Sequence, residues 1–205
     1  MNSNSTMPLG YSDVPPGHVA SVVTCLQMFD RPAAKDAPLP PGVTVDRWER
    51  PDIEGYRALF RRVGSDWLWT SRILMSDEDL SPILNDSAVE VFVVRADGEN
   101  VGLLELDFRE PGECELAFLG LGPGATGKGF GRAVINMAIG LAWSRPIRRF
   151  WVHTCTFDHP AALGFYIRSG FKPYAFQVEV LPDPRLSGHL PPEAGSHVPL
   201  ISPAE

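Results

Sequence analysis

The amino-acid sequence predicts an α/β protein of the α+β type, with helices flanking a mixed, mostly antiparallel central sheet. One observation is a hairpin signal: Asp97-Gly98, a pair typical of tight turns, joins two segments rich in valine and leucine. A second is that strand-like and helix-like segments alternate from residue 113 onward, as in strand–helix–strand units. Hairpins and crossover units in one chain imply that the sheet contains both antiparallel and parallel pairs.

The first half of the chain is expected to contain four strands and two helices, with a loop between the helices. The strand-like segments span residues 18–29, 43–48, 89–95 and 101–108. Pro51 can open a helix whose apolar residues recur at helical spacing: Ile53, Tyr56, Leu59, Phe60 and Val63. Ser76, with Asp79 three residues later, is typical of the start of a second, short helix.

The strand at residues 101–108 carries a further expectation about exposure. Leu104 and Leu106 alternate there with Glu105 and Asp107. Because successive side chains of a strand point to opposite faces, we expect one face to be buried and the other to be solvated.

The second half of the chain is expected to contain three more strands and two more helices. The strand-like segments span residues 113–121, 147–155 and 171–181. One helix is expected near Phe130, because an apolar stripe continues through Val134, Met137, Ala138 and Leu141. The other is expected to open at His159-Pro160 and to run to Ser169, because Gly170 is typical of a helix end.

Length and composition predict one sizeable domain with tails. The chain has 205 residues, and we expect a flexible lead at 1–17, the domain at 18–181 and an extended Pro-rich tail at 182–205.

The formal net charge of −7 argues against a protein that coats nucleic acid, since phosphate binding needs excess Lys and Arg. No apolar run approaches the roughly 20 residues of a membrane span. The cysteines Cys25, Cys114 and Cys155 form no disulfide framework, so we expect a cytoplasmic protein.

A glycine-rich segment, residues 121–132, lies between a predicted strand and a predicted helix. Unshielded amides of such a loop, together with the free N–H groups of a helix start, can hold a phosphate. Gly122–Lys128 matches the G-x-x-x-x-G-K pattern of an ATP-binding P-loop, but Gly129 stands where that loop has Ser or Thr for Mg²⁺. A dinucleotide fingerprint fits less well, because no acidic residue follows at the spacing expected for the ribose. A plain tight turn would need fewer glycines.

Coenzyme A is the third candidate ligand of this loop, because the segment resembles a known motif. It is similar to the phosphate-binding sequence R/Q-x-x-G-x-G/A of the GNAT N-acetyltransferase superfamily. Gly129 and Gly131 occupy the glycine positions of that motif, and Thr126 stands where the superfamily has Arg or Gln.

A second stretch, Asp158–Phe171, resembles the superfamily pattern N-x-x-A-x-x-x-Y-x-x-x-G-F, with His159 or Asp158 in place of the Asn. The likeness covers residues 18–181 and includes the order of the elements. It implies a GNAT fold whose strands splay apart at the cofactor, so that the pantetheine arm of acetyl-CoA binds as a pseudo-strand. The implied cofactor-binding residues are Leu119, Gly120, Leu121, Thr126, Gly127, Lys128, Gly129, Phe130, Gly131, Arg132, His159 and Ala162.

The resemblance also implies catalytic roles for two residues. Tyr166 matches the proton donor to the departing thiolate, although a tyrosine there could also simply pack in the core. Glu115 falls where many members carry a strand acid and is the candidate base, with deprotonation through water as the alternative. Asp107 and Glu105 are weaker candidates, and Glu113 reads as solvated surface. His153, Cys155 and His159 follow no zinc spacing, so we expect no metal.

The acceptor is expected to be a small-molecule amine or a peptide amine, with neither nucleic acid nor membrane as partner. Trp67 and Trp69 either cap the core or bind this substrate, since the corresponding superfamily loop forms one acceptor wall. A cationic acceptor would be attracted by the acidic residues of two neighbouring strands, which are Glu105, Asp107, Glu113 and Glu115. A P-loop-like nucleotide-binding protein and a non-catalytic CoA-binding module are the alternatives. A homodimer is compatible with the sequence.

Overall fold

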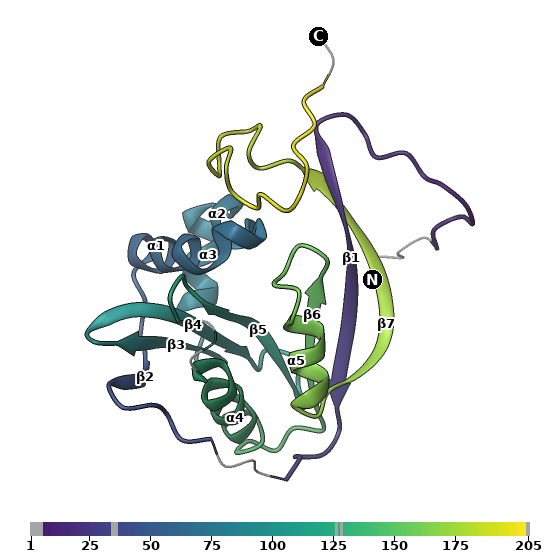
Figure 1. The fold of residues 1–205 in the computed structure, drawn as a ribbon. Helices are drawn as coiled ribbons and strands as arrows, with labels where there is room; N and C mark the ends of the chain where they lie inside the picture. Colours follow the sequence, from purple (N-terminus) through teal and green to yellow (C-terminus); the bar gives the residue numbers. More distant parts are fainter. Residues whose placement is uncertain (1–5, 34–36, 126, 128, 204–205) are drawn as a thin grey trace.

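A seven-stranded sheet forms the centre of the computed structural model, which describes residues 6–33, 37–125, 127 and 129–203 (Figure 1). The strand order is β2-β3-β4-β5-β6-β1-β7, and all neighbours are antiparallel except β5 and β6, which are parallel. The predicted mixed, mostly antiparallel sheet is therefore confirmed. The strands are β1 (His18–Met28), β2 (Val43–Arg47), β3 (Val89–Ala96), β4 (Glu99–Asp107), β5 (Glu113–Leu121), β6 (Arg149–Cys155) and β7 (Lys172–Pro182).

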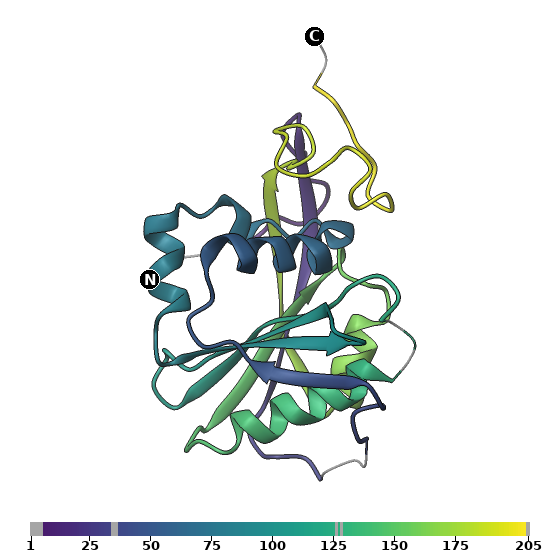
Figure 2. The same ribbon diagram turned by 90° about the vertical axis from the view of Figure 1, so that its left-hand side faces the viewer.

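Helices cover both faces of the sheet (Figure 2). On one face lie α1 (Ile53–Gly64), α2 (Ser71–Leu74) and α3 (Asp77–Leu84), with a 3₁₀ turn at Ser65–Trp67; on the other lie α4 (Phe130–Ala142) and α5 (Ala162–Arg168). Within the described part of the chain, no helix is both long and apolar enough to cross a membrane.

The helix starts follow from side-chain capping. The Asp52 carboxylate accepts a hydrogen bond from the Gly55 amide at 2.7 Å, and the Ser76 hydroxyl accepts one from the Asp79 amide at 3.1 Å. Helix α5 starts at Ala162 instead of His159, because the His159 carbonyl and ring form a turn with the amides of Ala162 and Ala161. The single turn of α2 was not predicted.

Both faces of β4 are buried, so the expectation of a solvated face was wrong. Glu105 is fully buried and Asp107 is 8% exposed. Helices α1 and α2 cover this face, where Tyr56 of α1 donates to Glu105 at 2.5 Å and Arg72 of α2 pairs with the same carboxylate. The two acids are tolerated in the core because each is matched by charged or polar partners.

The sheet opens between its two parallel strands. Pairing of β5 with β6 is confined to Glu113–Glu115 opposite Arg149–Trp151, although β5 continues to Leu121 and β6 to Cys155. Strand β1 lies between β6 and β7, and its first half pairs with β7 alone. The resulting β1–β7 ribbon forms the far flank of the opening (Figure 1).

The C-terminal segment folds back on the molecule, in contrast to the extended tail that we expected. Leu190 and Ala194 are 2% and 3% exposed and belong to the core beneath α1–α3. Asp183 and Arg185 form a buried ion pair at 2.7 Å. Burial of these side chains holds the segment against the domain despite its proline content.

Candidate active site

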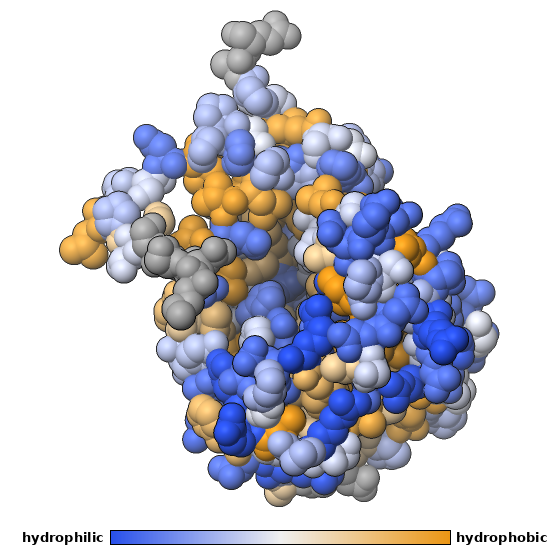
Figure 3. Space-filling view, turned by 180° about the vertical axis from the view of Figure 1, so that it is seen from behind, coloured by the Kyte–Doolittle hydropathy of each residue, from blue (hydrophilic) through white to orange (hydrophobic). Residues whose placement is uncertain are grey.

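A cavity of about 2220 Å³ occupies the opening between β5 and β6 and extends along the β1–β7 ribbon. From behind, the surface is hollowed beside this ribbon, and hydrophobic side chains gather along it (Figure 3). They include Val22, Phe176, Val178 and Val180, which are 45 to 75% exposed. Residues from both helical layers line the cavity, so it can hold two reactants that approach from opposite faces of the sheet.

The glycine loop borders this cavity and leads into α4. Gly124, Gly127 and Gly129 have φ values of +81°, +76° and +85°, which favour glycine. The first helical hydrogen bond of α4 runs from the Ala133 amide to the Gly129 carbonyl. Among the described residues, the amides of Phe130 and Gly131 precede this bond and, as at any helix start, are available to an anion. The predicted contacts of Thr126 and Lys128 lie outside the described residues.

The start of α4, the end of β5 and α5 converge at Gly131. A Cβ atom there would lie 3.7 Å from both Leu121 and the Phe165 ring. Phe130 is 7% exposed and packs in the core, so only its backbone could contact a ligand. Arg132 extends toward α5, where it donates to the Ser169 hydroxyl at 3.3 Å. Of the predicted loop residues, Gly127 and Gly131 line the cavity.

Three of the other residues predicted to contact the cofactor lie on the open edge of β5. Leu119, Gly120 and Leu121 line the cavity beyond the last pair with β6, as do Ala162 and His159 on the opposite side. Gly120 also has a packing role, because a Cβ atom there would approach the Val63 side chain of α1 to 2.9 Å.

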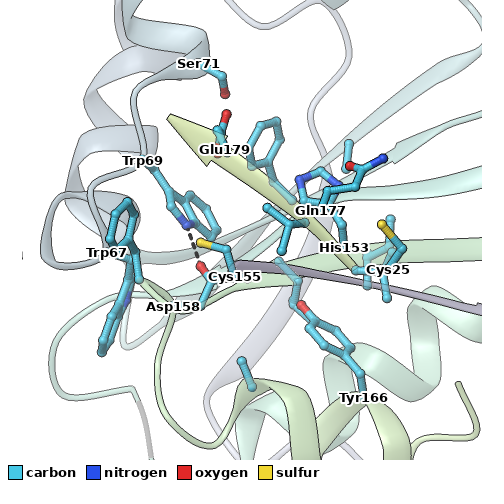
Figure 4. A pocket seen from close by; sticks show the side chains of 18 of the residues that line it. Cys25, Trp67, Trp69, Ser71, His153, Cys155, Asp158, Tyr166, Gln177 and Glu179 are labelled. Atoms are coloured by element: carbon cyan, nitrogen blue, oxygen red, sulfur yellow. Dashed lines mark hydrogen bonds between the residues drawn. The ribbon is translucent and has the colours of Figure 1, made fainter. Parts of the chain in front are cut away.

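Tyr166 projects from α5 into the cavity (Figure 4). Its ring packs against Phe165 and Phe171, at centroid distances of 5.5 and 5.9 Å. Burial raises the pKa of Tyr166 well above its usual value, and the nearby Asp158 carboxylate raises this pKa further. The phenol therefore stays protonated at neutral pH and can donate a proton.

Glu115 lies where β5 and β6 begin to separate. Its side chain is 25% exposed, and its carboxylate is 3.6 Å from Nδ1 of His153. Burial raises the pKa of Glu115 to about 7, with a further contribution from Asp107, its cross-strand neighbour on β4. A carboxylate with this pKa can exchange a proton near neutral pH, as a general base must.

The other strand acids carry arginine partners. Glu105 pairs with Arg72, Asp107 with Arg109 at 2.5 Å, and Glu113 with Arg149 at 3.0 Å. The negative charge of the expected acidic face is thus largely neutralised by these arginines. The spacing of the acids along the strands did not indicate their arginine partners. Glu105 also accepts a hydrogen bond from the Tyr56 hydroxyl and is fully buried, so a substrate amine cannot reach it and it is no longer a candidate base.

Trp67 and Trp69 both line the cavity from the loop after α1. Trp69 packs 5.4 Å from the Phe118 ring and donates its indole N–H to Asp158 at 2.9 Å (Figure 4). The second oxygen of Asp158 accepts from the Thr154 hydroxyl and the Cys155 amide, at 2.7 and 2.8 Å. Asp158 thus joins the tryptophan loop to the turn before α5. In the sequence, His159 or Asp158 stands at the Asn position of the superfamily pattern. The contact of Asp158 with Trp69 was not predicted, because the two residues are 89 positions apart.

Comparison with known proteins gives a family match. Residues 56–171 match the acetyltransferase (GNAT) family, whereas no curated protein matches the sequence. A GCN5-related N-acetyltransferase from Kribbella flavida is 22% identical with a TM-score of 0.52, over 84% of this chain and 63% of that one. A functionally unknown conserved protein from Staphylococcus epidermidis is 14% identical with a TM-score of 0.56, over 82% of this chain and 63% of that one.

A third similar structure is an aminoglycoside acetyltransferase from an uncultured soil metagenomic sample, solved in complex with trehalose. It is 19% identical with a TM-score of 0.52, over 63% of this chain and 88% of that one. At these identities the structures show a shared fold. The family match covers more than half of the residues. This chain therefore belongs to the GNAT acetyltransferase family.

Proposed function

We propose that this protein transfers an acetyl group directly from acetyl-CoA to a primary amine. The observation that carries the proposal is the opening of the sheet after Glu115 and Trp151, with the glycine loop at one end of the cavity and Glu115 at the other. Family membership supports acetyltransfer, and the free edge of Leu119–Leu121 is suited to bind the pantetheine arm as an added strand.

The residues divide the reaction between the two ends of the cavity. Glu115 removes a proton from the ammonium group of the acceptor, directly or through a water, and the free amine attacks the acetyl carbonyl carbon. The tetrahedral intermediate collapses as the carbon–sulfur bond breaks. Tyr166 donates its proton to the departing thiolate, and the nitrogen gives up its second proton, which restores the Tyr166 phenol directly or through a water. The products are the amide and CoA. No metal enters this scheme.

The acceptor that we favour is a small-molecule amine. The cavity wall contains the indoles of Trp67 and Trp69, which can contact a cation, and the carboxylates of Glu115 and Glu179 also line it. The likeness to an aminoglycoside acetyltransferase adds support for this class of acceptor. The free cysteines suit a reducing compartment, so we place the reaction in the cytoplasm.

The deciding experiment is a measurement of CoA release from acetyl-CoA with a panel of small primary amines, aminoglycosides, amino acids and peptides. We expect turnover with a small amine and a product heavier by one acetyl group in mass spectrometry. Binding of CoA without turnover of any amine would favour the non-catalytic module. A thermal shift with Mg·ATP and none with CoA would favour a nucleotide-binding loop.

A further inference from the structure

The C-terminal segment at residues 183–199 is a compact loop organised around one buried guanidinium. Arg185 is 6% exposed and donates two hydrogen bonds to Asp183, at 2.9 and 2.7 Å. The same guanidinium donates to four backbone carbonyls at 2.7 to 3.4 Å, those of Ala194, Gly195, Val198 and Pro199. Since one side chain closes the loop on itself, the segment can act as a rigid unit.

This loop packs on the segment that carries Trp67 and Trp69. Leu68, between the two tryptophans, has a left-handed φ of +56° and is 5% exposed. A Cβ atom at Gly195 would lie only 2.6 Å from the Leu68 side chain, so this side chain packs directly against the backbone of Gly195. Leu190 and Ala194 are buried in the same core. The C-terminal loop thus covers the outer side of the tryptophan segment.

His197 links this loop to two walls of the cavity. Its Nε2 lies 2.9 Å from the Phe157 carbonyl, an acceptor only, so Nε2 carries the hydrogen. Its ring lies 5.7 Å from the Trp67 ring, and the ring of His159 lies 5.2 Å from the same indole. The cavity is lined by Trp67, Phe157 and His159. His197 contacts the first two of them from the C-terminal loop.

We infer that the C-terminal loop braces the acceptor side of the active site, and that His197 is a positioning residue for Trp67. The inference rests on the proposed function for its kinetic consequence, but the brace itself is a property of the fold. The Trp69–Asp158 hydrogen bond fixes one end of the tryptophan segment, and His197 fixes the other. A Trp67 without this contact would sample several orientations and would bind an acceptor less well.

The kinetic test compares three variants with the acetyl-CoA assay and the best amine of the panel. His197→Ala should raise the KM for the amine roughly three- to tenfold, the worth of one aromatic contact. The kcat at saturating amine and the KM for acetyl-CoA should change less than twofold. His197→Gln, whose amide N–H can still reach the Phe157 carbonyl, should recover part of the loss. His189→Ala is the matched control, because His189 is exposed on the same loop.

A second readout needs no turnover. Hydrogen exchange followed by mass spectrometry should show faster exchange in residues 65–70 and 156–159 of His197→Ala, and unchanged exchange in β3 and β4. Absence of turnover in the wild type, with faster exchange in the variant, would reject the proposed function and leave the brace standing. Unchanged exchange in both segments, or an equal rise in the amine KM for His189→Ala, would overturn the brace. A general loss of stability in both His197 variants, affecting both substrates equally, would also overturn it.

Discussion

The ionisation of Glu115 controls the rate at neutral pH if this residue is the base. Because the pKa of Glu115 is raised to about 7, kcat/KM for the amine should rise as the pH increases from about 6 to 8. Glu115→Gln should lower kcat/KM roughly 10²-fold at pH 7, with partial recovery at high pH, where the amine deprotonates by itself. Glu113→Gln is the control, since Glu113 is paired with Arg149 on the same strand. An unchanged profile in Glu115→Gln would assign deprotonation to water.

The same substitution should change stability in the opposite direction. A carboxyl group whose pKa rises from 4.5 to about 7 on folding stabilises the protein below about pH 4.5, and this contribution is lost as the pH rises through 7. Glu115→Gln should therefore raise the free energy of unfolding at pH 8 by about 1–3 kcal/mol, and much less at pH 4. Urea unfolding at the two pH values measures the difference. An equal effect at both would show that the carboxyl titrates alike in the folded and unfolded chain.

Tyr166 permits a separate test of the acid. Tyr166→Phe keeps the ring that packs on Phe165 and Phe171, so CoA should still produce a full thermal shift. If the hydroxyl protonates the thiolate, kcat should fall roughly 10²–10⁴-fold. Tyr174→Phe, on β7 in the same cavity, should leave kcat near the wild-type value. An unchanged kcat in Tyr166→Phe, with chemistry rate-limiting, would return Tyr166 to a packing role.

At the scale of the element, the loop before α4 offers a substitution with a close control. Gly129 and Gly98 have φ values of +85° and +84°, and a Cβ atom at either would meet no atom of the described residues within 4 Å. Valine at each position should therefore cost similar backbone strain. Only Gly129→Val should abolish the stabilisation by CoA, which is about 2.7 kcal/mol at 100 times the dissociation constant. Equal CoA shifts in the two variants would disprove binding by this loop.

Local patterns were sufficient to predict most elements. Interactions that act over a few residues can be recognised in the sequence itself. They include the helix caps at Asp52 and Ser76, the Asp97-Gly98 turn and the apolar spacing of α1 and α4. The burial of Glu105 could not be predicted in this way, because it depends on Tyr56 and Arg72 from helices far away in the sequence.

The candidate site shows the same division between local and distant information. Glycine spacing predicted the loop at the cavity, and the tyrosine motif predicted a side chain that the structure places inside it. The pairing of Trp69 with Asp158 joins residues 89 positions apart, and His197 reaches Phe157 across 40. Nothing in a local window of the sequence indicates such pairs.

At the scale of the whole molecule, the cavity divides the sheet into two parts, β2–β5 and β6–β1–β7. Three residue pairs join β5 to β6 in the described part of the chain. A CoA arm added along β5 would tie the parts together, so CoA should slow hydrogen exchange in residues 116–121 and 152–155. Exchange in β3 should stay unchanged, because β2 and β4 already pair with it. Equal slowing across the whole sheet would point to general stabilisation rather than binding in the opening.

The position of β1 in the sheet has a consequence for synthesis on the ribosome. Val22 of β1 donates a hydrogen bond to the Thr156 hydroxyl, 134 residues later, and β7 lies later still. At about 5–20 residues per second, the first strand waits roughly 7–27 s before its neighbour emerges. During this interval an apolar strand of 11 residues has neither edge paired, which favours aggregation or capture by a chaperone. Slow codons between β1 and β6 would prolong the exposure, so the yield of folded protein should fall when this part of the chain is translated more slowly.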